Sequence, residues 1–261
     1  MQKSTFKRMY LTLATIFILI LTFPLLSAKH KPANDTKLSS VGTTAAIAGE
    51  LNVFNINSKL VNSAAALYDS MDLDLMGLSR TAFDYAMKGF DYLVQTGKFT
   101  NDNIISIVDF SLPSSKKRLF VIDLDQAKVL YNTYVAHGAK SGAAMATQFS
   151  NTPESNKSSL GFYETLQTYN GGHGYSLKLN GLERGINDNA NSRAIVIHPA
   201  AYVDESLIRS QGYIGRSWGC PALPEKLSKP IINTIKGGTC LFLFSPDKTY
   251  LSRSKIINAS V

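Results

Sequence analysis

The spacing of apolar residues changes near position 104, and this change limits the fold more than any other feature of the 261-residue chain. Before it, apolar residues recur every three or four positions, as on one face of a helix. After it, they alternate with polar residues or form short β-branched runs between Gly-, Ser- and Asn-rich segments. These runs predict strands over residues 104–110, 118–124, 128–136, 160–168, 175–179, 194–198 and 239–245. Many short strands with a few short helices indicate a mainly β fold, a barrel or a sandwich.

Helical patterns precede the strands and predict a small helical N-terminal subregion that packs on the sheet. The first pattern covers residues 58–71. In the second, Ser79 has the side chain of a helix N-cap and Gly97 ends the helix. A third helix is expected after the loop that contains Cys220, with Ser228 as its cap.

The N-terminus has the pattern of an export signal. Lys3, Lys7 and Arg8 precede an apolar run from Met9 to Leu26. This predicts a secretory signal or, because the run is long, an uncleaved membrane anchor, and hence a protein of the periplasm or extracytoplasmic cell envelope. The predicted order is signal or anchor 1–28, flexible linker 29–49, helical subregion 50–100, β domain 101–248 and C-terminal tail 249–261.

The net charge of the chain is mildly positive. It is +8 overall, and residues 1–28 hold three basic and no acidic side chains, so the remainder carries +5. This excess suits an anionic envelope polymer, but no basic cluster interleaved with aromatic residues predicts a nucleic-acid partner. Contact with a membrane is expected only through an N-terminal anchor, and the sequence sets no oligomeric state.

The stretch from residue 194 to residue 222 holds a histidine and a cysteine in one region. His198 ends a predicted buried strand, a place where catalytic groups are common. Cys220 precedes Pro221, a residue suited to the first position of a helix, so the cysteine is expected at a helix N-cap, where backbone N–H groups lower a thiol pKa. Gly219 permits a tight backbone that brings an N–H close to a bound carbonyl oxygen.

His198 followed by Ser217, Gly219 and Cys220 resembles the motif of the murein L,D-transpeptidase catalytic-domain family, in which an upstream His precedes Ser-His-Gly-Cys. Trp218 stands where the common pattern has its second His, which marks a divergent subgroup. Other segments similar to the family are residues 152–153 with 158–163, 137–138, 171–175 and 198–202. The resemblance covers residues 104–245 and implies an L,D-transpeptidase-like β barrel or sandwich.

The resemblance also implies a chemistry and residue roles. Cys220 is the expected nucleophile and His198 the expected base, with Ser217 and Gly219 in the catalytic loop. The implied reaction is acyl transfer between peptidoglycan stem peptides, forming 3-3 cross-links through a Cys220 thioester and needing no cofactor. If water resolves the thioester, the same residues make an L,D-carboxypeptidase or endopeptidase.

Four further residues are candidates for substrate binding, each with a structural alternative. Arg216 either pairs with a stem-peptide carboxylate or is a solvated charge. Trp218 either lines the groove or fills the core beneath the loop. His173 is either in the groove or a hydrogen-bonded loop residue, and Tyr202 is left equally open.

Two alternatives compete with the thiol enzyme. A disulfide between Cys220 and Cys240 would make a non-catalytic protein that binds the wall, although Cys240 lies in a predicted buried strand, where a free thiol behaves as a small hydrophobe. His137, His173 and His198 could suggest a metal, but no His-x-x-x-His or Cys-x-x-Cys spacing is present, so no metal site is expected.

Overall fold

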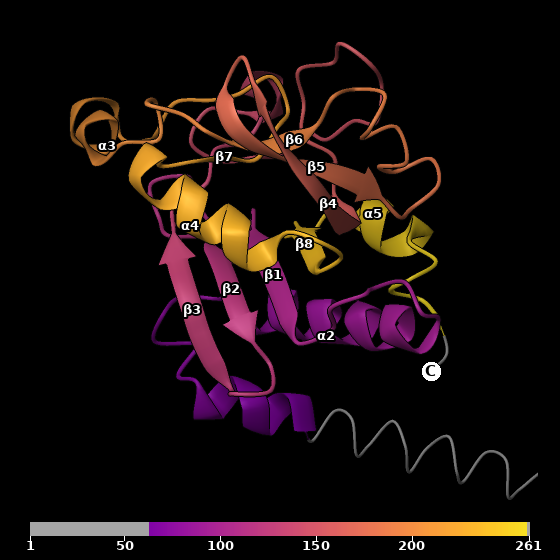
Figure 1. Ribbon diagram of the computed structural model, residues 1–261. Helices are drawn as coiled ribbons and strands as arrows, with labels where there is room; N and C mark the ends of the chain where they lie inside the picture. Colours follow the sequence, from indigo (N-terminus) through magenta and orange to yellow (C-terminus); the bar gives the residue numbers. More distant parts are fainter. Residues whose placement is uncertain (1–62, 260–261) are drawn as a thin grey trace, which may run out of the picture. The chain divides into compact units, whose positions relative to one another are not determined.

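The computed structural model describes residues 63–259, and the predicted export signal and linker lie outside them. The described residues form one eight-stranded sheet with short helices around it (Figure 1). In spatial order the strands are β3 (Lys128–Thr133), β2 (Leu119–Asp123), β1 (Ile104–Asp109), β8 (Cys240–Phe244), β4 (Gly161–Gly171), β5 (Gly174–Gly181), β6 (Val196–Pro199) and β7 (Ala222–Leu223). The fold is therefore mainly β, as the short apolar runs predict.

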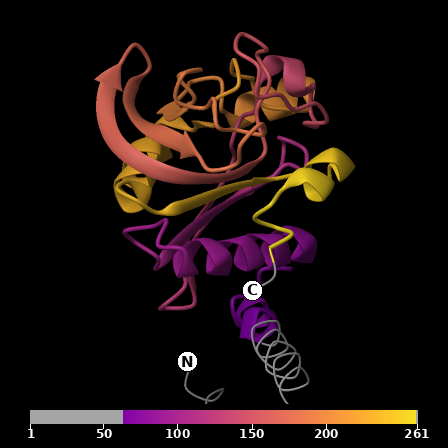
Figure 2. The ribbon, with the colours of Figure 1, turned by 90° about the vertical axis from the view of Figure 1, so that its right-hand side faces the viewer.

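The sheet nearly closes into a barrel. Only the β1–β8 and β6–β7 pairs are parallel, and the other neighbours are antiparallel. Figure 2 shows the long β4–β5 hairpin as a strongly curved ribbon. An isolated antiparallel bridge between Ala136 and Ala222 then joins the chain just beyond β3 to β7 at the opposite edge. This contact brings the two ends of the sheet together where the motif residues lie.

Helix α2 (Arg80–Gln95) covers one face of the sheet along β1 and β8 (Figure 1). Ser79 caps it, as predicted, by accepting a hydrogen bond from the N–H of Ala82, and Gly97 follows its last turn. The helix lies very close to β4, because a Cβ built on Gly89 would be 2.1 Å from the ring of Phe162. Only a glycine allows this approach, which packs the predicted helix onto the predicted sheet.

Helix α4 (Glu225–Ile235) contacts β1, β5 and β6, and it corrects two sequence predictions. Ser228 does not cap it: the helix starts three residues earlier after Pro224, and the Ser228 hydroxyl donates to Glu225 O within the first turn. Pro221 does not begin a helix, because residues 222–223 pair with β6 as β7. Cys220 is therefore not a helix N-cap, and strand pairing has overridden the local preference of proline.

Two further helices, α3 (Glu205–Gln211) and α5 (Lys248–Arg253), were not predicted. Each is short and capped by an aspartate, Asp204 for α3 and Asp247 for α5. Helix α5 belongs to the segment expected as the C-terminal tail, and its Tyr250 hydroxyl donates to the buried carboxylate of Glu183. Within residues 63–259, no helix is long and apolar enough to cross a membrane.

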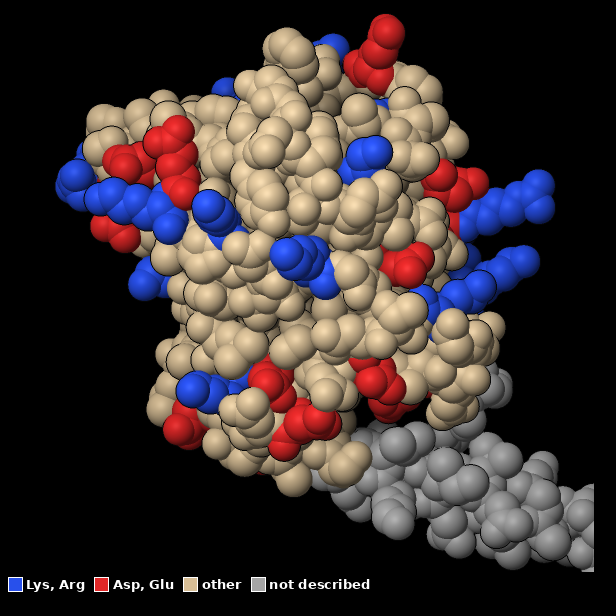
Figure 3. Space-filling model, viewed as in Figure 1, with Lys and Arg blue, Asp and Glu red and all other residues tan. Residues whose placement is uncertain are grey.

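The surface carries charges of both signs. On the face drawn in Figure 3, lysine, arginine, aspartate and glutamate side chains are interspersed, and no single-sign field covers that face. This agrees with the mild positive charge of the sequence and with a solvated surface.

Candidate active site

Strands β6 and β7 bring His198 and Cys220 to one place. They pair in parallel with His198 opposite Ala222. Cys220 precedes Ala222 by two residues, and its thiol donates to Ala194 O at 3.7 Å, two residues before the start of β6. The sheet therefore holds the two residues on adjacent segments, two positions apart in register.

The hydrogen bond of the His198 ring fixes its tautomer. His198 is buried, and its Nδ1 lies 2.9 Å from Pro199 O. A carbonyl oxygen only accepts, so Nδ1 carries the proton and Nε2 keeps its lone pair. Burial lowers the pKa of His198, and the nearby His173 lowers it further. His198 is thus neutral at pH 7 with a free nitrogen, the state required of a base.

His173 lies beside His198. It occupies the turn between β4 and β5, is exposed, and its ring centroid is 4.6 Å from that of His198 with 30° between the planes. The two histidines are far apart in the sequence and meet because β5 pairs with β6.

Ser217 shapes the loop that carries the cysteine. Its backbone bonds on both sides to the segment after β3, with Ser217 N donating to His137 O and Ala139 N donating to Ser217 O. Its hydroxyl donates to Cys220 O at 2.6 Å and accepts from Gly219 N at 3.1 Å. The hydroxyl therefore closes the Ser217–Cys220 turn and is not bonded to the imidazole.

Gly219 is required by the shape of this turn. Its φ is +126°, and a Cβ there would be 2.8 Å from Lys157 O. Ser158 supports the turn from below: its hydroxyl donates to Gly219 O at 3.1 Å and accepts from Gly138 N.

Because the Gly219 N–H is held by Ser217, it is not free to bind an oxyanion. Within residues 63–259, the N–H of Cys220 donates to no protein acceptor, and it is the better candidate.

The environment of the Cys220 thiol differs from the prediction. Burial raises the pKa of Cys220, while the Val196 N–H and the Arg193 guanidinium oppose that rise. The expected lowering at a helix N-cap is absent because no helix begins there. The Cys220 thiol and the His198 imidazole are therefore both neutral at pH 7.

The other predicted binding residues occupy different surroundings. Trp218 is 80% exposed at the tip of the turn, which excludes the interpretation that it fills the core. Tyr202 packs against Gly215, and burial together with the Cys220 charge raises its pKa to about 12. The Nη1 of Arg216 donates to Gly142 O at 3.2 Å.

Arg193 was missed by the sequence analysis. It lies just before β6, is half-buried, and donates to four acceptors of one segment: Ser150 O, Ser155 Oγ, Lys157 O and Ser159 Oγ. The sequence feature that could have indicated its role is a lone arginine directly before a predicted buried strand.

His137 is a structural residue beneath the loop. It is fully buried, its Nδ1 is 2.7 Å from Arg118 Nη2, and its Nε2 is 3.3 Å from Gly142 O. Burial lowers the pKa of His137 to about 4, and the Arg118 cation acts in the same direction. Arg118 is also buried, and its pKa is lowered to about 9, so it remains a cation at neutral pH.

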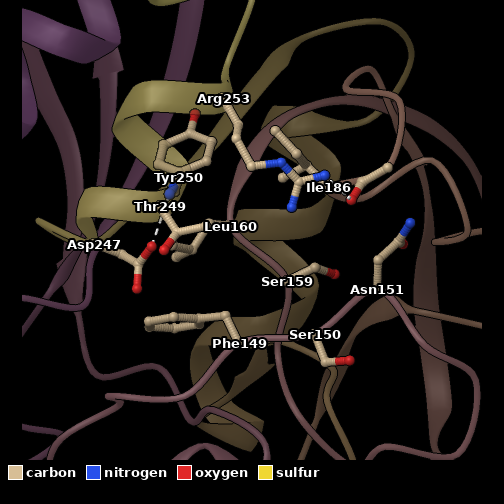
Figure 4. Close-up of a pocket in the computed structure, with 11 residues that line it drawn as sticks. Phe149, Ser150, Asn151, Ser159, Leu160, Ile186, Asp247, Thr249, Tyr250 and Arg253 are labelled. Carbon is tan, nitrogen blue, oxygen red and sulfur yellow. Dashed lines mark hydrogen bonds between the residues drawn. The ribbon is translucent and has the colours of Figure 1, made fainter.

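A pocket of about 260 Å³ opens beside the segment that Arg193 binds. Figure 4 shows Ser150 and Ser159 next to each other on one wall, with Tyr250 and Arg253 of α5 across the opening. None of the predicted site residues lines it.

Both cysteines are free thiols, and Cys240 is fully buried in β8, as predicted. The disulfide between Cys220 and Cys240 that the non-catalytic alternative requires is therefore not formed in this structure. Among the described residues, no three His, Cys, Asp or Glu side chains gather as metal ligands.

Comparisons with known proteins give the following matches. The sequence model of the L,D-transpeptidase catalytic domain matches residues 75–244. Similar solved structures include an L,D-transpeptidase from Mycobacterium smegmatis, with 13% identity over 55% of this chain and 59% of that chain and a TM-score of 0.35. Another is the helical cell shape determining protein Pgp2 from Campylobacter jejuni, with 14% identity over 62% and 57% and a TM-score of 0.37. A third is an L,D-transpeptidase (Yku) from Stackebrandtia nassauensis, with 14% identity over 63% and 68% and a TM-score of 0.36. The chain spans less than two thirds of the first two structures. No curated protein sequence matches it.

Proposed function

The chain belongs to the L,D-transpeptidase catalytic domain family, and from this premise we propose that it is an exported cysteine acyltransferase of the cell envelope. Its substrates are peptidoglycan stem peptides, and its product is a 3-3 cross-link formed through a Cys220 thioester. The observation that carries the proposal is the His198 tautomer, which leaves a lone pair on Nε2 beside the strand that positions Cys220.

The first half-reaction forms the thioester. Cys220 Sγ attacks the carbonyl carbon of the link between the diamino acid at stem position three and the terminal D-Ala, and the thiol proton passes to His198 Nε2. The Cys220 N–H stabilises the developing oxyanion, an effect worth roughly 3 kcal/mol per donor. As the C–N bond breaks, His198 returns the proton to the leaving amine of D-Ala.

The second half-reaction resolves the thioester. The side-chain amine of a second stem attacks the acyl carbon and loses a proton to His198 Nε2. The C–S bond breaks, Cys220 takes the proton back, and a new amide joins the two stems. If water takes the place of the amine, the same steps give an L,D-carboxypeptidase or, on a cross-linked substrate, an endopeptidase.

In this proposal Trp218, His173 and Tyr202 supply the substrate-binding surface. Trp218 offers an uncovered indole face at the tip of the turn, suited to a peptide or a sugar ring. His173 and Tyr202 flank the reacting pair, one beside the base and one near the thiol. Arg216 is held by a backbone carbonyl, so in this proposal it attracts a stem carboxylate only from the rim.

Incubation of the protein with a disaccharide-tetrapeptide muropeptide, followed by mass spectrometry, tests this function. An acyl-enzyme on Cys220 together with a cross-linked dimer supports transfer, and a trimmed tripeptide stem supports hydrolysis. Absence of all three over a range of pH rejects the enzyme.

The second candidate, a non-catalytic wall-binding protein, predicts that the Cys220 thiol is dispensable. Cys220→Ala would then keep both wall binding and cellular effect.

A further inference from the structure

Arg193 ties one surface segment to the back of the catalytic turn. Its guanidinium donates to Ser150 O at 2.8 Å and Ser159 Oγ at 3.1 Å through Nη1, and to Lys157 O at 2.7 Å through Nη2. Nη2 also reaches Ser155 Oγ at 3.2 Å. The planar guanidinium of Arg193 is held rigidly by these four acceptors. A lysine ammonium at the same position could not make all of these hydrogen bonds.

The same guanidinium lies directly behind Gly219. Its Nη2 is 3.4 Å from the position of a Cβ on Gly219, and Lys157 O, which Nη2 binds, is 2.8 Å from that position. Lys157 is followed by Ser158, whose hydroxyl binds Gly219 O. The guanidinium, the 150–159 segment and the turn therefore form one continuous packed unit.

No carboxylate neutralises this cation. In the part of the chain that the structure describes, ion pairs involve only Arg80, with Asp69 and Asp84. Arg193 is thus a half-buried positive charge whose ionisable neighbours are the Tyr163 hydroxyl and the Cys220 thiol. Arg216, the other arginine of this region, is bonded to Gly142 O and lies over the ring of Tyr213.

We propose that Arg193 is a positioning residue that holds the 150–159 segment under the Ser217–Cys220 turn and stabilises the thiolate of Cys220 as the thiol loses its proton. The catalytic consequence rests on the proposed function, whereas the effect on the thiol does not. Ser150 and Ser159, two of the residues that the guanidinium binds, form the wall of the pocket in Figure 4, so the same residue also orders that wall.

Alkylation of Cys220 by iodoacetamide as a function of pH tests the electrostatic part, with the modified residue located by peptide mass spectrometry. Arg193→Gln removes the charge and should raise the apparent pKa of Cys220, and each unit of rise lowers the alkylation rate at pH 8 by about tenfold. Arg193→Lys keeps the charge and should retain most of the wild-type profile. Arg184→Gln, an exposed arginine of the preceding turn, is the matched control and should change nothing.

Turnover of the muropeptide tests the positioning part. Arg193→Lys and Ser159→Ala keep a cation at position 193 but lose hydrogen bonds between the guanidinium and the 150–159 segment. Both variants should therefore lower kcat while leaving the apparent pKa of Cys220 nearly unchanged. If Arg193→Gln does not fold, Arg193→Lys and Ser159→Ala still decide, because unchanged kcat in both overturns the inference.

The two proposals fail in different ways. A folded Arg193→Gln protein with an unchanged alkylation profile overturns the role of Arg193 even if the wild type is an active enzyme. A wild type that makes no product, but whose thiol responds to Arg193→Gln as described, overturns the proposed function and leaves the electrostatic role of Arg193 supported.

Discussion

The hydroxyl of Ser217 donates a 2.6 Å hydrogen bond to the carbonyl oxygen of Cys220 and at the same time accepts one from the N–H of Gly219. One side chain therefore satisfies two backbone groups of the turn that carries Cys220. The N–H of Cys220 is left without a protein acceptor within residues 63–259, and the turn is fixed before any substrate binds.

Ser217→Ala should loosen this turn. Loss of the hydroxyl leaves a carbonyl and an N–H without partners, which costs about 1–3 kcal/mol, and kcat should fall because the Cys220 N–H is no longer held in place. Urea unfolding and muropeptide turnover measure the two effects. Ser210→Ala, in exposed helix α3, is the control. Wild-type kcat in Ser217→Ala would show that the turn does not depend on this hydroxyl.

The pH profile of Cys220 alkylation should rise only above the ordinary range of a thiol, because burial raises the Cys220 pKa. This reverses the expectation from the sequence, which places the thiol at a helix N-cap. The causes of the Cys220 shift are burial, the Val196 N–H and the Arg193 guanidinium, and His198 is neutral, so His198→Ala should leave the alkylation profile unchanged while abolishing turnover. A profile that shifts upward in His198→Ala would mean that the resting pair is charged.

Cys220→Ser should abolish turnover and leave the melting temperature unchanged, because a hydroxyl beside a neutral histidine is a much weaker nucleophile than a thiol. Cys240→Ser is the matched substitution in the fully buried strand β8. It should keep kcat and lower the free energy of unfolding by about 1–3 kcal/mol, the cost of burying a hydroxyl. Equal loss of activity in the two variants would contradict separate roles.

Trp218 is the only tryptophan, so its fluorescence reports directly on the loop. Binding of a muropeptide should shift its emission to shorter wavelength as the 80% exposed indole is covered. Trp218→His, which restores the common family residue, should raise KM more than it lowers kcat and leave the melting temperature unchanged. A large drop in melting temperature, or emission insensitive to substrate, would remove Trp218 from the binding surface.

Stability should fall in acid through His137. Its folded pKa is about 4, below the ordinary value of 6.5, so between these values the unfolded chain binds a proton that the folded chain does not. The contribution of His137 to the free energy of unfolding is therefore at its maximum above about pH 6.5. It declines by about 3 kcal/mol as the pH falls to about 4.

His137→Asn keeps an amide oxygen for Arg118 and removes the titrating group, so the acid decline should be smaller in the variant. Urea unfolding of both proteins over this pH range gives the difference. Parallel curves would show that His137 does not cause the decline.

The sequence alone determined the local features of the fold. Alternating or short apolar runs predicted β1, β2, β3, β4, β5, β6 and β8, and the serine before residue 80 predicted the start of α2. These succeed because strand alternation and helix capping are decided by neighbouring residues. The order of the motif residues also predicted His198 and Cys220 as a reacting pair, which stays a prediction, and the family match spans both residues.

What only the tertiary structure decided depends on contacts between distant segments. Pro221 favours a helix start, but residues 222–223 gain more from pairing with β6, and this removed the expected N-cap for Cys220. Arg193 has no local pattern, since its acceptors lie about 40 residues earlier in the chain. The partial burial of Cys220, the His198 tautomer and the exposure of Trp218 likewise arise only when β6, β7 and the 150–159 segment meet, because burial and hydrogen-bond partners are properties of the packed chain.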